Sequence, residues 1–76
     1  MSDITAGVAA AVNMIPGTRI EKCRRLGVSV PTLDRWRAGV GQPTEENLAR
    51  LARLAGVDQE WIRNGGHDDM ENNNGE

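Results

Sequence analysis

Apolar residues recur along the chain every three or four positions, in short runs separated by glycine and proline. Between Ile4 and Ile15 this spacing places the apolar side chains on one face of a helix. Alanines at 9–11 favour helix by intrinsic propensity. Pro16 ends the run, because the residue before a proline avoids the α region. The pattern therefore predicts a first helix over residues 3–14.

Two further short helices are predicted on either side of Gly27. Thr18 and Glu21 have the spacing of a capping box, which predicts a helix from Thr18 to about Leu26. Gly27 suits the left-handed conformation that ends many helices, and Ser29 is a good N-cap for the next one. The segment is thus predicted to form helix, glycine-containing turn and helix, which is the layout of a helix-turn-helix.

Helical spacing also predicts which sides of these two helices are buried. Ile20, Cys23 and Leu26 are expected to point inward from the first of them, and Leu33 and Trp36 from the second. A single cysteine cannot form an internal disulfide, and at an inward position it is a small core residue. The chain has two tryptophans and no phenylalanine or tyrosine. Each tryptophan is therefore expected to provide much of the packing.

Residues 39–43 are expected to form a loop, and the segment after them contains two more helices. Thr44, followed by two glutamates, predicts the start of one helix, and Gly56 predicts its end. Its apolar stripe consists of Leu48, Leu51, Ala52 and Ala55. Asp58 is the expected N-cap of a short fifth helix that residues 64–66 close. With no strand pattern in the sequence, the predicted fold is all-α, with five short helices around one small core.

The charged residues are unevenly distributed along the chain, whose formal net charge is −2. Residues 67–76 contain four acidic residues and no lysine or arginine, and they are rich in asparagine. This composition predicts a disordered acidic tail or linker after a domain over residues 1–66. Residues 19–37 contain six basic residues against two acidic ones, a net charge of +4. Positive charge concentrated on one motif is typical of a surface that binds nucleic acid.

A series of short motifs follows in order along residues 26–65: Leu26-Gly27-Val28-Ser29, Thr32-Leu33, Arg35-Trp36, Gly39, Pro43, Asn47-Leu48, Leu51-Ala52, Gly56-Val57, Glu60-Trp61-Ile62 and Asn64-Gly65. Their order and spacing resemble the lambda-type phage repressor and Cro domains, over residues 4–66. The resemblance implies a five-helix, lambda-repressor-like DNA-binding domain that acts as a dimer on a palindromic operator. It also implies a transcriptional regulator in the bacterial cytoplasm, associated with the nucleoid. A complete Cro-like protein and the amino-terminal domain of a longer repressor both fit it.

The residues expected to contact DNA lie at the start of the second helix, in the turn and on the third helix: Arg19, Ser29, Val30, Pro31, Thr32, Asp34, Arg35 and Arg37. Arg35 is predicted to read a base, since a guanidinium can donate two hydrogen bonds to guanine. Arg19 and Arg37 are predicted to contact phosphates, the most frequent acceptors in protein–DNA interfaces. Val30 can contact a thymine methyl group or pack within the protein, and the sequence leaves both roles open.

The chain departs from the family's pattern in the second helix, where Lys22 precedes Cys23 in place of an apolar residue, and at two places on the expected DNA-binding surface. Val30 and Pro31 stand where the family often has long polar side chains that read bases. Basic residues that are common in the first helix and after the third are replaced by alanines and by Val40-Gly41-Gln42. Phosphate contacts are therefore expected mainly from the second helix and from backbone amides.

A self-association surface is predicted at Trp61 and Ile62, because the other apolar faces are needed for the internal core. The sequence contains no plausible nucleophile–base pair and no glycine loop that would cradle a phosphate, so no enzymatic activity and no cofactor are expected. His67-Asp68-Asp69 has no second cluster of metal ligands beside it, so no metal site is expected either. The apolar run that ends at Ile15 is too short to span a bilayer.

Two alternative functions use the same helices. The first is an antitoxin-type autorepressor, which binds its own operator and a toxin partner. The second is a protein-interaction module that holds a partner protein between the helix pair. Binding that weakens steeply with salt distinguishes contact with DNA from contact with an apolar protein surface.

Overall fold

The computed structural model of the protein describes residues 4–66, which form five α-helices and no strand. The helices are α1 (Ile4–Met14), α2 (Arg19–Leu26), α3 (Val30–Arg37), α4 (Glu45–Ala55) and α5 (Gln59–Arg63). The predicted all-α, five-helix fold is confirmed. The predicted tail, with His67-Asp68-Asp69, lies outside the described residues. None of the five helices has the length and apolar character needed to cross a membrane.

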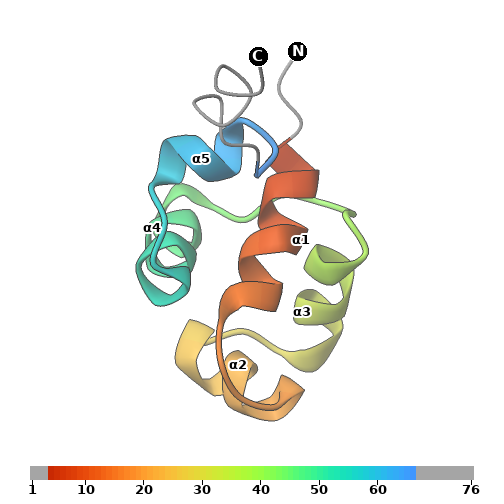
Figure 1. The fold of residues 1–76 in the computed structure, drawn as a ribbon. Helices are drawn as coiled ribbons and strands as arrows, with labels where there is room; N and C mark the ends of the chain where they lie inside the picture. The colour runs from red at the N-terminus through yellow and green to blue at the C-terminus, as the bar shows by residue number, and fades with distance from the viewer. Residues whose placement is uncertain (1–3, 67–76) are drawn as a thin grey trace.

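Helix α1 runs through the middle of the molecule (Figure 1). Helix α3 packs on one side of it, and α4 and α5 pack on the other. Helix α2 contacts both α3 and α4 at the end of the molecule where α1 finishes. The α2–α3 pair is therefore supported from behind by α1 and α4, and the remaining surface of α3 faces outward.

Most helix starts are stabilised by the side chains that the sequence predicts. The hydroxyl oxygens of Thr18, Ser29 and Thr44 each accept a hydrogen bond from the backbone N–H three residues later, at 3.2, 3.4 and 3.2 Å. The Glu21 carboxylate accepts a bond from the Thr18 N–H at 2.8 Å, which completes the predicted capping box. Asp58 occupies the N-cap position of α5, but its side chain makes no capping hydrogen bond.

One apolar core joins all five helices and contains no buried polar side chain within residues 4–66. Its members are Val8, Ala11, Val12, Ile15, Cys23, Leu26, Leu33, Trp36, Leu48, Leu51, Ala52 and Ile62. The prediction for Ile20 is wrong, because its side chain is 55% exposed. Six residues of helix rotate Ile20 by about 120° from Leu26. The inner face of α2 lies between Cys23 and Leu26, so it leaves Ile20 in the solvent.

Helices α1 and α5 approach each other more closely than the sequence suggested. Gly7 is buried on α1, and a Cβ atom at this position would overlap the backbone carbonyl of Ile62. Only glycine fits such an approach without moving one helix away from the other. The Ile62 side chain is fully buried, so α5 is attached to the core through this residue.

Candidate nucleic-acid interface

The turn between α2 and α3 is formed by residues 27–29, as the sequence predicts. Gly27 adopts the left-handed conformation, with φ of 73°. The N–H groups of Gly27 and Val28 both donate to the Cys23 carbonyl oxygen, at 2.8 and 3.1 Å. These bonds satisfy the end of α2 and turn the chain sharply. Ser29 then begins α3, so the two helices are held at a fixed angle by three residues.

Arg50 of α4 braces this turn, a role that sequence reasoning missed. Its Nη1 atom donates a hydrogen bond to the Leu26 carbonyl oxygen at 3.0 Å, and its Nη2 atom lies 3.9 Å from the Glu46 carboxylate. Arg50 is not among the residues that the sequence assigned to the site. A charged donor on the last carbonyls of α2 is favourable, because the helix dipole is negative there. Arg50 therefore ties the orientation of α2 to α4.

Helix α3 has one buried side and one exposed side. Leu33 and Trp36 are buried in the core, whereas Pro31 and Arg35 are exposed on the opposite side. Val30 is half-buried and packs against the core, which supports the packing role that the sequence left open. The exposed side of α3 therefore has Arg35 in the last turn of the helix, about one turn after Pro31.

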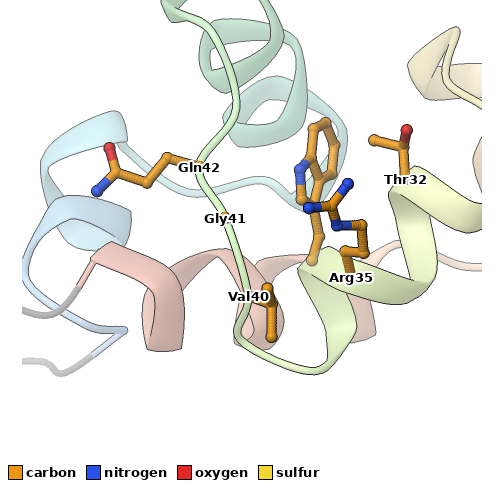
Figure 2. A pocket seen from close by; sticks show the side chains of 6 residues that line it. Thr32, Arg35, Val40, Gly41 and Gln42 are labelled. Carbon is orange, nitrogen blue, oxygen red and sulfur yellow. The ribbon is translucent and has the colours of Figure 1, made fainter.

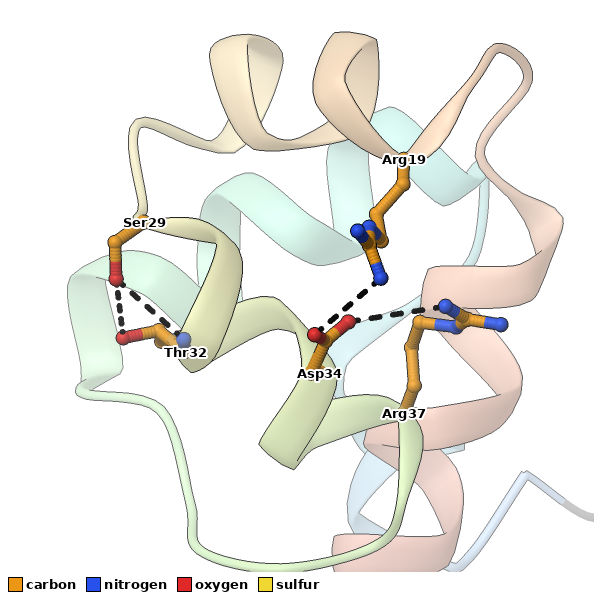
Figure 3. Close-up of polar contacts among 5 residues, drawn as sticks. All are labelled: Arg19, Ser29, Thr32, Asp34 and Arg37. Atoms are coloured by element: carbon orange, nitrogen blue, oxygen red, sulfur yellow. Dashed lines mark hydrogen bonds and ion pairs between the residues drawn. The ribbon is translucent and has the colours of Figure 1, made fainter.

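Arg19, Asp34 and Arg37 form one edge of this exposed side, which we call the paired flank. The Asp34 carboxylate lies 3.5 Å from Arg19 Nη1 of α2 and 3.8 Å from Arg37 Nη1 of α3. Figure 3 shows both guanidinium groups converging on this carboxylate from different helices. All three side chains are about half exposed, at 54%, 44% and 46%. Exposed pairs of this kind contribute only about 0–1 kcal/mol each, so the paired flank orients charges more than it stabilises the fold.

The other edge of the exposed side, which we call the loop flank, is an open hollow of about 220 Å³ between α3 and the loop that follows it. It is lined by Thr32, Arg35, Trp36, Val40, Gly41 and Gln42. Figure 2 shows Arg35 on the α3 side and the loop opposite, with the Gln42 side chain turned away from Arg35. The Arg35 guanidinium forms no hydrogen bond or ion pair within residues 4–66. It is therefore free to bind an external acceptor.

The loop reaches this position because of Gly39. This residue is left-handed, with φ of 78°, and its N–H donates to the Trp36 carbonyl oxygen at 3.1 Å. The Val40 N–H donates to the Arg35 carbonyl oxygen at 2.8 Å, so the chain turns back beside α3. Sequence reasoning assigned residues 39–43 to a loop without placing them at the site. The glycine directly after the last helical turn was the signal for this reversal.

The remaining predicted site residues lie close to these flanks. The Ser29 and Thr32 hydroxyl groups are 3.0 Å apart at the start of α3, where they hydrogen-bond to each other. Basic side chains of the described part that have no ion pair are Lys22, Arg24, Arg25, Arg35 and Arg53. Three of these five belong to α2. Residues 4–66 contain no cluster of side chains placed to bind a metal ion.

The two residues predicted to mediate self-association lie in different environments. Trp61 is half-buried at the surface of α5, whereas the Ile62 side chain is 0% exposed. A second copy can touch Trp61 without a rearrangement of the core. The side chain of Ile62 is already fully used inside the monomer.

Comparison with known proteins gives two matches. A family model described as helix-turn-helix matches residues 19–62. An uncharacterized helix-turn-helix-type transcriptional regulator of Haemophilus influenzae is 40% identical over 45 residues, which are 59% of this chain and 19% of that protein. The match thus spans about a fifth of the relative's length. No solved structure matches the chain significantly.

Proposed function

The chain belongs to the helix-turn-helix family of transcriptional regulators, and from this we propose that it is a regulator of the phage repressor and Cro type that recognises one DNA sequence. This family binds DNA and is not enzymatic. The observation that carries the proposal is the exposed side of α3, where Arg35 has no partner inside the described residues. In the proposed complex this side enters the major groove, while α1 and α4 support it from behind.

The proposed roles of the site residues follow from their surroundings. Arg35 reads a guanine with two hydrogen bonds. Arg19 and Arg37 contact phosphates on the side of the paired flank. The remaining predicted residues complete the proposed DNA-contacting set: Ser29, Val30, Pro31, Thr32 and Asp34. Gln42, at the edge of the loop flank, is added to this set. The backbone amides of Gly41 and Gln42, on the loop that lines the hollow, are proposed as further phosphate donors.

We propose that two copies bind two inverted half-sites of a palindromic operator and block transcription there, in the cytoplasm of a bacterial cell. The contact between the copies is proposed at α5, through Trp61, because the Ile62 side chain is enclosed in the core. The half-sites are then about 34–36 Å apart, one turn of DNA, on one face of the duplex. Residues 1–66 act as the DNA-binding domain, and the acidic segment 67–76 as a tail or linker.

Selection of bound duplexes from a random DNA library tests this proposal directly. The expected result is one enriched motif made of two inverted half-sites, protected in a footprint on one face of the duplex. Binding to the selected site weakens steeply between 50 and 200 mM salt, by roughly 10³-fold for about six phosphate contacts. A library without an enriched motif would refute sequence-specific recognition. A single asymmetric site that binds one copy would refute the dimer.

A second candidate function is favoured by the apolar side chains near the junction of α1 and α2. Met14 and Ile20 are 48% and 55% exposed there. Exposed apolar side chains are suited to contact with a protein, as in an antitoxin-type autorepressor that also holds a toxin. Co-purification of a specific partner that Ile20→Ser abolishes, with DNA binding retained, would support this candidate.

A further inference from the structure

Asp34 occupies an electrostatically unfavourable position for a helix that faces DNA. Residues 19–37 contain two acidic side chains, Glu21 and Asp34. Glu21 is used locally, since its carboxylate accepts the Thr18 N–H in the capping box of α2. Asp34 caps no helix and lies half exposed on α3, next to Arg35 in the sequence. A carboxylate there repels every phosphate that approaches the helix.

The two oxygens of Asp34 engage one arginine each. Oδ2 lies 3.5 Å from Arg19 Nη1, and Oδ1 lies 3.8 Å from Arg37 Nη1. The first contact joins α2 to α3, across 15 residues of sequence (Figure 3). A guanidinium has five N–H donors, and both arginines remain about half exposed. Asp34 therefore restrains the two guanidinium groups and leaves most of their donors directed toward solvent.

We propose that Asp34 determines specificity by acting through Arg19 and Arg37, and that it lowers affinity for arbitrary DNA more than affinity for the operator. Binding to arbitrary DNA comes almost entirely from attraction between cations and phosphates. One carboxylate shared by two arginines reduces that attraction equally on all sequences. Restrained guanidinium groups meet phosphates well only when α3 lies at one depth and register in the groove. Arg35 has no partner and reads its base unhindered. This inference rests on the proposed DNA binding.

The variant Asp34→Asn tests the inference, because it removes the charge and keeps the size of the side chain. Parent and variant are titrated with the selected operator and with an unrelated duplex at several salt concentrations. Affinity of the variant for the unrelated duplex is expected to rise about eightfold at 0.1 M salt, with a salt slope steeper by about one unit. Affinity for the operator is expected to rise by less than about twofold, since loss of the restraint offsets the gained charge. The ratio of the two affinities therefore falls.

Asp58→Asn is the matched control. It makes the same chemical change at an exposed carboxylate that precedes α5, at the N-cap position, and has no capping bond and no ion pair. Asparagine is an equally good N-cap. It should leave the affinity ratio at the parent value. Asp34→Glu, which retains the charge, should restore the ratio to within about twofold of the parent. In a background of Arg19→Gln and Arg37→Gln, Asp34→Asn should no longer change the ratio.

Each other outcome overturns the inference. Equal ratios for the parent and Asp34→Asn show that the carboxylate has no role in discrimination. Equal effects of Asp34→Asn and Asp58→Asn show that overall charge is responsible. A loss of affinity confined to one base pair shows that Asp34 reads a cytosine directly. If the parent itself binds no DNA in a salt-dependent manner, the proposed function fails together with the inference, whereas the first three results leave that function intact.

Discussion

The two flanks of α3 differ in whether their arginine side chains are ion-paired. On the paired flank, two arginines from different helices share the carboxylate of Asp34. On the loop flank, the guanidinium of Arg35 has no partner within residues 4–66, and a tryptophan and a backbone loop lie beside it. Helix α3 thus lies between a restrained cation pair, to which α2 contributes Arg19, and the guanidinium of Arg35, which has no partner in the described residues.

The two flanks therefore contribute differently to the stability of the domain and to its proposed recognition of DNA. The loop flank is built on Trp36, a 4% exposed core residue, and on the left-handed Gly39 that turns the loop back. The paired flank consists of half-exposed charges whose mutual attraction is weak. Substitutions on the loop flank should therefore change folding or base reading. Those on the paired flank should change the electrostatic part of binding.

The largest expected effect comes from Trp36→Ala, which removes the buried side chain on which the loop flank is built. Truncation of a buried tryptophan costs about 3–5 kcal/mol of folding free energy, and small domains have only about 5–15 kcal/mol in total. Thermal unfolding followed by circular dichroism should show a cooperative transition at a far lower temperature than in the parent, or no transition at all. Arg37→Ala on the paired flank is the control, with a change of about 0.5 kcal/mol or less. A transition temperature near that of the parent would show that Trp36 does not stabilise the core.

Arg35→Ala should give the next largest effect, and on binding alone. Loss of a guanidinium that reads guanine is expected to cost about 1–3 kcal/mol on the selected site and to flatten the preference at one base pair. Titrations of the operator and of its single-base variants measure both changes. An equal loss on every sequence would show that Arg35 contacts the DNA backbone, and base reading would then move to Val30, Asp34 or Arg37.

Arg19→Ala should weaken binding to the operator and to all its single-base variants alike. The salt slope is expected to fall by about one unit, because one phosphate contact is lost. The base preferences of the selected site should stay unchanged. Titrations at several salt concentrations on specific and unrelated duplexes provide the comparison. A change in preference at one position would place Arg19 in a groove and would contradict its assignment to the paired flank as a phosphate ligand.

Gln42→Ala should give the smallest effect. The Gln42 side chain is exposed and turned away from Arg35 (Figure 2), so the loop contributes mainly through its backbone. A single neutral hydrogen bond contributes about 0.5 kcal/mol at the low end of the usual range, and the loss is expected to be no larger than this. Operator titration measures it. A loss as large as that of Arg35→Ala would show that the loop flank recognises DNA through Gln42.

The sequence predicted the local structure well because the interactions involved span only a few residues. The capping box of Thr18 and Glu21 needs a spacing of three, and Gly27 needs only its own freedom at positive φ. The buried positions Leu33 and Trp36 follow from helical periodicity. The five helices, their order and the helix-turn-helix were therefore predictable before any tertiary contact was known.

The candidate site was predicted only as a set of residues on the second and third helices. The sequence assigned Arg19, Asp34, Arg35 and Arg37 to one set of DNA-contacting residues, with no ion pair among them. In the structure Asp34 instead pairs with Arg19 and Arg37. A pairing across 15 residues depends on the angle at which α2 crosses α3, and no local rule specifies that angle.

The sequence by itself therefore determined where each helix begins, which side of most helices is apolar and where positive charge accumulates. Tertiary structure alone decided that Ile20 is exposed, that Ile62 is enclosed and that Gly7 touches the backbone of α5. It also decided that Arg50 reaches the Leu26 carbonyl across 24 residues. The physical reason is range: caps and periodicity act within one turn of helix, whereas burial and long ion pairs depend on how separate helices pack together.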